Sequence, residues 1–282
     1  MRTFEYHRAT SVAEAVDLLQ AEDSHVLAGG TSFVLLWRQG LLQPAHVVDI
    51  RRLPELSGVR RTPEGGLEIG ATTTHRQAET SADVQAYCAA LTETFGHVAT
   101  IRIRNQGTVG GNLAHADPAQ DPPPMLLALD AQVVVHGSQG ERVIPLDDFF
   151  VDYFETALAS DEVLTAIRCP PLAAGTRATY VKFLPRTQDD YATVAVGATL
   201  RLGEDGRCEH LRIGLGSLGS VPLRARTVEA ALLGQRLTPE VIADASALVR
   251  DEVDPLEDVR GSVRYKREMA RVWVSRALSR LL

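Results

Sequence analysis

The chain has 282 residues, of which 45% are hydrophobic and 23% are charged, and its net charge is −7 at pH 7. This length and composition are ordinary for a globular protein with two or three domains, and the excess of acidic residues argues against non-specific binding to nucleic acid. The sequence has no run of about 18 apolar residues that would predict a membrane span, and no apolar N-terminal segment typical of a secretory signal.

The N-terminal region predicts a small β-α-β unit. Ser11 stands before an amphipathic segment as an N-cap, and Glu14 occupies the matching capping-box position. A strand over 25–28, a helix over 31–39 and a strand over 47–50 follow. The turn between the first of these strands and its helix contains Gly29 and Gly30, with Thr31 or Ser32 as the expected N-cap.

The middle of the chain mixes helical and strand patterns. Thr74 and Gln77 have the spacing of a capping box, which predicts a helix start. Asp121 precedes three prolines that open a further short helix. The other expected elements are helices over 83–95 and 98–103, a helix ending near 129, a hairpin of 132–136 with 142–145, and a strand over 162–168.

A proline- and glycine-containing linker over 170–176 separates this region from the C-terminal part. Beyond it, strands come first and helices later, which favours a separate α+β domain with a three-stranded antiparallel sheet. Thr238 and Pro239 form an N-cap followed by proline at the first helical position. The expected strands are 178–184, 192–202 and 208–216, and the expected helices are 226–233, 239–252 and 262–282.

Two glycine pairs carry the strongest functional signal. Leu27-Ala-Gly-Gly-Thr-Ser32 and Thr108-Val-Gly-Gly-Asn112 each place glycines beside small hydroxyl residues at an element boundary. Glycine lets backbone N–H groups approach a ligand closely, and consecutive exposed N–H groups form a nest for an anion. Two such nests suit a ligand with two linked phosphates, and FAD is the expected ligand.

A third glycine motif is interpreted differently. Gly214-Leu-Gly-Ser-Leu-Gly219 matches the GxGxxG dinucleotide fingerprint, but Val221-Pro222 follows where that fingerprint requires a helix. We therefore expect a glycine-rich strand end there. Cys88, Cys169 and Cys208 are widely spaced and match no zinc or iron–sulfur pattern. Such cysteines favour a reduced, cytoplasmic protein whose redox chemistry would need an organic cofactor.

The second glycine pair lies within the longer segment 103–118, which begins Ile103-Arg-Asn-Gln-Gly-Thr108 and ends His115-Ala-Asp-Pro118. In this segment above all, the sequence resembles the FAD-binding medium subunits of the molybdenum hydroxylases. This family includes the flavoproteins of aerobic carbon monoxide dehydrogenase and xanthine dehydrogenase. The resemblance covers essentially the whole chain. It implies an α+β fold, with a two-part FAD-binding domain of the vanillyl-alcohol-oxidase type over 1–55 and 56–172 and a C-terminal domain over 176–282.

The resemblance also implies site residues. Residues of the first glycine motif would hold the pyrophosphate, Asp121 would accept hydrogen bonds from ligand hydroxyls, and Tyr191 would cover the isoalloxazine ring as the catalytic aromatic. Phe33, Val34 and Trp37 depart from the family pattern without removing a backbone donor. The full implied FAD set is Leu27, Ala28, Gly29, Gly30, Thr31, Ser32, Phe33, Val34, Val98, Thr108, Val109, Gly110, Gly111, Asn112, Asp121, Leu164, Lys182 and Tyr191.

Several of these residues have simpler interpretations that the sequence leaves open. Asp121 could only cap the following helix, Tyr191 could be an ordinary buried aromatic, and Lys182 could face solvent on its strand. Arg102 and Arg104 could form local ion pairs or face a partner. Finally, the spacing of His115, Asp117 and Asp121 fits no familiar metal site, so no metal is expected on this chain.

The family resemblance implies an electron-transfer subunit with non-covalently bound FAD. A large subunit would carry molybdenum-pterin and a small subunit two [2Fe-2S] clusters, in a heterotrimer that dimerises. The substrate and the final acceptor (quinone, oxygen or NAD) stay open. Alternatives are a stand-alone flavoenzyme, for which His97 and Tyr191 would be the candidate groups, and a scaffold that has lost its flavin.

Overall fold

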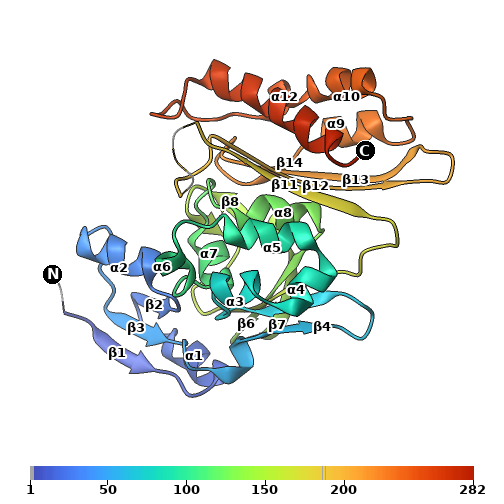
Figure 1. Cartoon of the computed structure of the whole chain (residues 1–282). Coiled ribbons are helices and arrows are strands. Elements are labelled where there is room, and N and C mark those ends of the chain that lie inside the picture. The colour runs from blue at the N-terminus through green and yellow to red at the C-terminus, as the bar shows by residue number, and fades with distance from the viewer. Residues whose placement is uncertain (1–2, 186, 188) are drawn as a thin grey trace.

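The computed structural model describes residues 3–185, 187 and 189–282. Their strands form sheets of three, five, four and two strands. Figure 1 shows the three-stranded sheet at the N-terminal end of the molecule, the five-stranded sheet in the middle and the four-stranded sheet beneath the C-terminal helices. Every helix in this part of the chain is too short or too polar to span a lipid bilayer.

The N-terminal unit is a parallel sheet of order β1-β3-β2 with two helices. Ser11 caps the first helix as predicted, whereas the carboxylate of Glu14 accepts the N–H of Thr10 instead of closing the box on Ser11. The second helix starts differently from the prediction, because Gly30 is its N-cap, in the left-handed conformation with φ 76°. The elements are β1 (Glu5–Arg8), α1 (Val12–Leu18), β2 (Ser24–Leu27), α2 (Thr31–Arg38) and β3 (His46–Asp49).

The middle unit is an antiparallel sheet of order β4-β5-β10-β6-β7, accompanied by six helices. Both hydrogen bonds of the predicted Thr74–Gln77 capping box are present. The helix predicted over 83–95 is instead broken at Cys88, whose backbone is extended. The elements are β4 (Val59–Arg61), β5 (Leu67–Gly70), α3 (His75–Glu79), α4 (Ala82–Tyr87), α5 (Ala89–Gly96), α6 (Ile101–Arg104), α7 (Val109–His115), α8 (Pro122–Ala128), β6 (Gln132–Gly137), β7 (Gly140–Pro145) and β10 (Val163–Cys169).

Short elements fill the connections of the middle unit. They are the 3-10 helices η1 (Pro54–Leu56) and η2 (Leu146–Asp148) and the two-stranded sheet of β8 (Phe150–Asp152) and β9 (Glu155–Thr156).

The C-terminal unit has one strand more than predicted. Its antiparallel sheet has the order β11-β12-β13-β14, because the two residues of β14 pair with Gly214 and Leu215 of β13. The predicted helix over 239–252 is divided in two. The elements are β11 (Arg177–Phe183), β12 (Val194–Leu202), β13 (Cys208–Gly216), β14 (Leu223–Arg224), α9 (Arg226–Leu232), α10 (Pro239–Ser246), α11 (Val249–Glu252) and α12 (Val263–Ser279).

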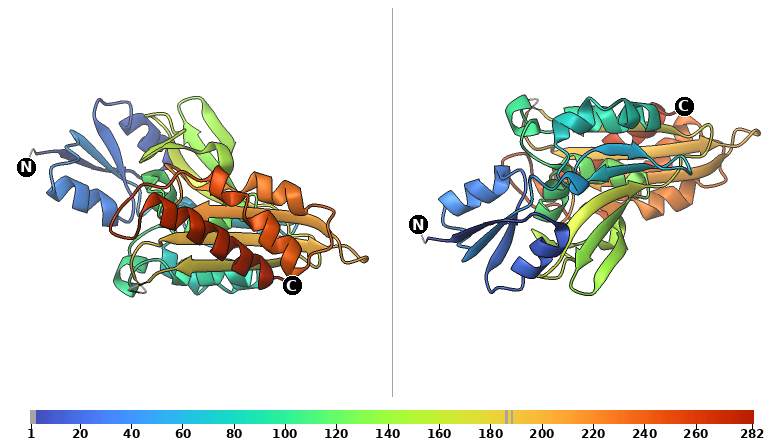
Figure 2. Two further views of the ribbon diagram at one scale, coloured as in Figure 1. Left: turned by 90° about the horizontal axis from the view of Figure 1, so that it is seen from above. Right: turned by 90° about the horizontal axis from the view of Figure 1, so that it is seen from below.

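Helices α9 to α12 cover one face of the C-terminal sheet, as the view from above in Figure 2 shows. Helix α8 of the middle unit packs on β12 and β13 from the other side, and all seven of its residues are buried. A Cβ added at Gly214 would lie 2.0 Å from the carbonyl oxygen of Pro124, and one at Gly197 would lie 2.6 Å from the Cα of Met125. The GxGxxG motif is thus a strand end, as expected, and its first glycine lets a helix approach the sheet.

Candidate functional site

A cavity of about 900 Å³ lies where the three units meet. Its walls come from the turn between β2 and α2, the loop before α7, the N-terminal end of α8, strands β10 and β11, and residues 189–191. This volume is near the upper end of the range of roughly 300–1,000 Å³ that is typical of small-molecule sites. The cavity therefore has room for an extended ligand of cofactor size.

The structure brings most of the predicted site residues together around this cavity. The exceptions are Leu27, Val34 and Val109, which are absent from its lining. Val109 is fully buried in the core, and Val34 is 43% exposed on α2. The predicted residues that line the cavity are Ala28, Gly29, Gly30, Thr31, Ser32, Phe33, Val98, Thr108, Gly110, Gly111, Asn112, Asp121, Leu164, Lys182 and Tyr191.

The first glycine motif presents the N-terminus of α2 to the cavity. Gly30, Thr31 and Ser32 line it, and no side chain caps this helix. The first N–H groups of a helix have no acceptor within the helix, and the positive end of its dipole favours an anion. Gly29 is needed for a different reason, because its Cβ would lie only 2.3 Å from the carbonyl oxygen of Gln106. The two glycine motifs can therefore approach each other this closely only because residue 29 has no side chain.

The second glycine motif does not form the predicted nest. The N–H of Val109 donates to the carbonyl of Thr73 at 2.9 Å, and that of Gly110 donates to the carbonyl of Ala71 at 2.9 Å. The N–H of Gly111 donates to the hydroxyl of Thr108, which is the N-cap of α7. The backbone donors are therefore used inside the protein. Gly110 serves close packing instead, since its Cβ would lie 2.6 Å from that of Ala71.

A buried polar cluster of Asp121, Tyr180 and Lys182 contributes to one wall of the cavity. The ammonium of Lys182 donates to Asp121 Oδ2 at 3.0 Å and to the carbonyl of His97 at 3.0 Å. The hydroxyl of Tyr180 donates to Asp121 Oδ1 at 2.7 Å. The side chain of Lys182 is only 1% exposed, so the solvent-facing interpretation is wrong. Sequence reasoning missed Tyr180 because nothing in its local pattern links it to Asp121.

This cluster balances a buried charge. Burial raises the pKa of Asp121, while the charge of Lys182 and the hydroxyl of Tyr180 oppose that rise. An ammonium has three donors, and the two bonds described above leave one for a ligand in the cavity. Each carboxylate oxygen of Asp121 likewise keeps acceptor capacity. Asp121 is also the N-cap residue of α8, but its side chain makes no capping bond there.

Three buried polar atoms among the cavity-lining residues have no hydrogen-bond partner in the described part of the chain: His75 Nδ1, Asn112 Oδ1 and Gln120 Oε1. Buried polar groups are normally paired, so such atoms call for a partner from a bound ligand or water. Burial lowers the pKa of His75 to about 4, with a further lowering from Arg104, and its ring is neutral at neutral pH. His75 and Gln120 were not predicted from the sequence.

The lining suits FAD. One cavity combines three features: a helix N-terminus that suits a pyrophosphate, residues with unpaired polar atoms that suit hydroxyls and ring edges, and an apolar lining. The apolar lining includes Phe33, Val98 and Leu164. A mostly apolar lining with a few placed polar groups is the usual form of a cofactor site.

Tyr191 lies at the rim of the cavity and is 42% exposed. The guanidinium of Arg260 lies 5.6 Å from the centre of its ring, which is within reach of a cation–π contact. Burial of its hydroxyl end raises the pKa of Tyr191, with a further contribution from Asp117, so the phenol is protonated at neutral pH. The guanidinium of Arg260 thus lies over the ring, which keeps a substantial exposed surface.

The remaining polar candidates have structural contacts. Arg104 pairs with Glu79 at 3.0 Å and donates to the carbonyls of Val98 and Ala99, so it braces the chain before α6. The ring of His97 packs against Tyr180, with 5.7 Å between ring centres, and His97 is absent from the cavity lining.

His115, Asp117 and Asp121, which were not expected to bind a metal, have other contacts, and the cysteines are unpaired. His115 packs against Phe154, the carboxylate of Asp117 accepts the N–H of Ala119, and Asp121 pairs with Lys182. Cys88, Cys169 and Cys208 are free and buried.

Comparison with known proteins places these features in a family. Residues 2–172 match the FAD binding domain in molybdopterin dehydrogenase, and residues 179–281 match the CO dehydrogenase flavoprotein C-terminal domain. The carbon monoxide dehydrogenase medium chain of Hydrogenophaga pseudoflava is 38% identical over 279 residues, which cover 98% of this chain and 96% of the relative. Subunit alpha of the 6-hydroxypseudooxynicotine dehydrogenase complex of Paenarthrobacter nicotinovorans is 35% identical and covers 99% of this chain and 95% of its own length.

Solved structures agree with the sequence comparisons. A structure of the carbon monoxide dehydrogenase from Hydrogenophaga pseudoflava contains a chain that superposes with a TM-score of 0.95 at 40% identity, covering 99% of this chain and 96% of that chain. A chain of quinoline 2-oxidoreductase from Pseudomonas putida 86 superposes with a TM-score of 0.92 at 29% identity, covering 99% and 96%. The chain therefore belongs to the family of FAD-binding medium subunits that includes the carbon monoxide dehydrogenase medium chain and the xanthine dehydrogenase FAD-binding subunit.

Proposed function

We propose that this chain is the FAD-binding electron-transfer subunit of a molybdenum hydroxylase complex. It receives electrons from the [2Fe-2S] clusters of a small partner subunit and passes them to an external acceptor, while a large molybdopterin-binding subunit oxidises the substrate. The observation that carries the proposal is the cavity of about 900 Å³ with an uncapped helix N-terminus in its wall. The relatives' names, such as medium chain and complex subunit, support a role within a complex.

FAD, when bound, supplies redox chemistry in steps of one electron or two. The N-terminal turn of α2, from Gly30 to Ser32, would hold its pyrophosphate, because unpaired N–H groups and the helix dipole favour negative charge there. Asn112 and the free donor of Lys182 would bind polar groups of the ligand. Asp121 would hold Lys182 in place and accept hydrogen bonds from ligand hydroxyls.

Tyr191 would cover the isoalloxazine ring at the rim of the cavity and limit the access of water to it. Its half-exposed ring and the flanking guanidinium of Arg260 support this role. We further propose that the FAD-binding part comprises residues 1–55 and 56–172, that residues 176–282 form the C-terminal domain, and that the complex is a dimer of heterotrimers.

A stand-alone flavoenzyme is the weaker candidate. It would need a base beside the flavin, yet the ring of His97 packs on Tyr180 outside the cavity lining, and burial raises the pKa of Tyr191 so that its phenol is a poor base at neutral pH. The relatives with solved structures include subunits of carbon monoxide dehydrogenase. The groups of this chain therefore favour binding and positioning over substrate oxidation.

The first test is a visible absorption spectrum of the purified chain, followed by heat denaturation and chromatography of the supernatant. We expect the bands of an oxidised flavin and release of about one FAD per chain. A chain that stays colourless even after incubation with FAD would contradict the assignment of the cavity.

A second test uses two glycines with different surroundings. Gly29→Ala should separate the two glycine motifs and abolish flavin retention, because its Cβ would lie 2.3 Å from a backbone oxygen. Gly96→Ala is the control, since its added Cβ would lie 3.5 Å from a side-chain oxygen of Glu79, an ordinary contact, and it should keep its flavin. Equal flavin content in both variants would show that the first glycine motif is not part of the flavin site.

A third test addresses the partners. Affinity purification of the chain from its source cells should bring down molybdenum and iron in a fixed ratio to flavin, measured by elemental analysis. If the flavin-loaded chain purifies without either metal and is reduced directly by a small molecule, the stand-alone function is the correct one.

A further inference from the structure

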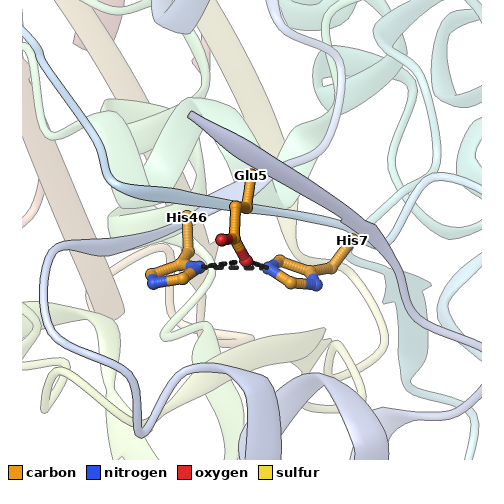
Figure 3. A group of neighbouring side chains, drawn as sticks. All are labelled: Glu5, His7 and His46. Carbon is orange, nitrogen blue, oxygen red and sulfur yellow. Dashed lines mark hydrogen bonds and ion pairs between the residues drawn. The ribbon is translucent and has the colours of Figure 1, made fainter. Parts of the chain in front are cut away.

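The N-terminal sheet carries a side-chain cluster that is separate from the cavity. Glu5 and His7 lie two residues apart on β1 and so share one face of the strand. His46 opens β3 and is the direct register partner of Glu5. Figure 3 shows the two imidazole rings and the carboxylate converging on one point. None of the three residues lines the cavity.

The distances within this cluster match those of a metal-binding set. His7 Nε2 and His46 Nδ1 are 3.1 Å apart, and Glu5 Oε2 lies 3.8 Å from the first and 3.6 Å from the second. Ligand atoms bound tetrahedrally at 2.0–2.2 Å from zinc are separated by roughly 3.4 Å. The three observed separations bracket this value, so one ion can contact all three atoms after small side-chain movements.

We propose that Glu5, His7 and His46 bind a divalent transition-metal ion of the zinc type. Two imidazole nitrogens and one carboxylate oxygen suit zinc and its neighbours, whereas magnesium and calcium prefer oxygen ligands throughout. The side chain of Glu5 is 74% exposed and those of both histidines are about a quarter exposed, which leaves a solvent side where water completes the coordination.

The position of the cluster in the sheet predicts that a bound ion acts on stability and not on the cavity. Glu5 and His46 are the first residues of parallel strands, so the cluster lies at the amino-terminal edge of the sheet. Gly29 and Gly30 follow the carboxyl end of β2 and therefore lie at the opposite edge. The ion would tie β1 to β3 without reaching the cavity, and its effect is on the stability of the N-terminal unit. This inference does not depend on the proposed function.

The test is a calorimetric titration of ZnCl₂ into the untagged full-length chain after treatment with a chelator. We expect one zinc ion per chain, and a tenfold or greater loss of affinity in both His46→Gln and Glu5→Gln. His136→Gln is the matched control, because His136 is another partly buried histidine on a strand, β6, and it should keep the wild-type affinity. Far-ultraviolet circular dichroism, measured on every variant, reports that the fold is intact.

X-ray absorption at the zinc edge supplies a second measurement. The site should show two imidazole nitrogens at 2.0–2.1 Å together with oxygen ligands. Zinc should also raise the unfolding temperature of the wild-type chain and leave that of His46→Gln unchanged. Absence of stoichiometric binding, or wild-type affinity in His46→Gln, would show that the pair is only a hydrogen bond between histidines.

Discussion

At the residue scale, His75 links the cavity to acid stability. Its ring is buried, and burial lowers its pKa from 6.5 to about 4. Between these two values the unfolded chain binds a proton that the folded chain does not, so this contribution to stability is complete above about pH 6.5 and is lost as the pH falls to about 4. The difference corresponds to about 3 kcal/mol.

We therefore expect the free energy of unfolding of the flavin-free chain to fall between pH 6.5 and 4, and His75→Gln to flatten this dependence. Urea unfolding at a series of pH values measures both curves. If the free energy of unfolding of the variant falls with pH as steeply as that of the wild-type chain, other titrating groups cause the loss of stability.

The Asp121 cluster gives a second prediction at this scale. Lys182→Met leaves a carboxylate buried without its counter-ion and should cost about 3–5 kcal/mol. Tyr180→Phe removes one hydrogen bond to the same carboxylate and should cost less, about 1–3 kcal/mol. Chemical denaturation of both variants at pH 7 compares the two costs, and equal values would mean that the ion pair contributes no more than the hydrogen bond.

How much of the site could be predicted differs from residue to residue. Contiguous motifs identified Gly30, Thr31 and Ser32 in the cavity wall, because a strand-to-helix turn is encoded locally. The Tyr180–Asp121 bond joins residues 59 positions apart, and no local pattern contains that information. The prediction of an anion nest at the second glycine pair was wrong for a related reason. The sequence shows that the backbone there can approach a neighbouring group closely, but only the fold shows that this neighbour is Ala71 and not a ligand.

At the element scale, α8 is the joint between the middle and C-terminal units. Its residues are all buried against the core and the sheet of β12 and β13, and glycines in those strands make room for its backbone. A side chain at such a place has no free volume to occupy, and forced overpacking typically costs about 1–3 kcal/mol.

Gly214→Ala tests this joint. Its Cβ would lie 2.0 Å from the carbonyl oxygen of Pro124, so we expect a loss of at least about 1–3 kcal/mol in thermal or urea unfolding. Gly96→Ala is the control, because its nearest neighbour outside its own helix is a side-chain oxygen of Glu79 at 3.5 Å. It should be neutral or stabilising, since alanine is the better helix former. A neutral Gly214→Ala would contradict the tight packing of α8.

The elements themselves were largely predictable where a cap marks them. Thr74 and Thr238 cap their helices as expected, because capping depends on residues three positions apart. The break at Cys88 and the two-residue strand β14 were missed. A strand of that length exists only through its pairing with β13, and short-range patterns do not encode that pairing.

At the scale of the whole molecule, the cavity depends on all three units. Its lining runs from His25 in the N-terminal sheet to Tyr191 beyond β11. The sequence could place the glycine motifs in one family, but a cavity assembled from distant segments is a property of the folded chain. Removal of the C-terminal unit from the chain should therefore destroy the cavity and also expose the face of α8 that packs on β12 and β13.

A chain that ends at residue 175 lacks Lys182 and Tyr191 and uncovers α8. We expect it to expose apolar surface, to bind the dye ANS and to retain no flavin. Co-expression of residues 176–282 as a second polypeptide should restore the yellow colour, because the sheet can cover α8 again. A short chain that is monomeric, free of ANS binding and yellow would show that the first two units suffice.

The spread of the cavity wall along the chain also sets an order of events during synthesis. The ribosome releases the glycine turn at Gly29 and Gly30 early, but Lys182 and Tyr191 emerge only after about two-thirds of the chain has been made. A nascent chain therefore cannot enclose a ligand in the complete cavity before Lys182 and Tyr191 have been made. Enclosure follows the synthesis of β11 and residues 189–191, so a chain that stops earlier lacks part of the cavity wall.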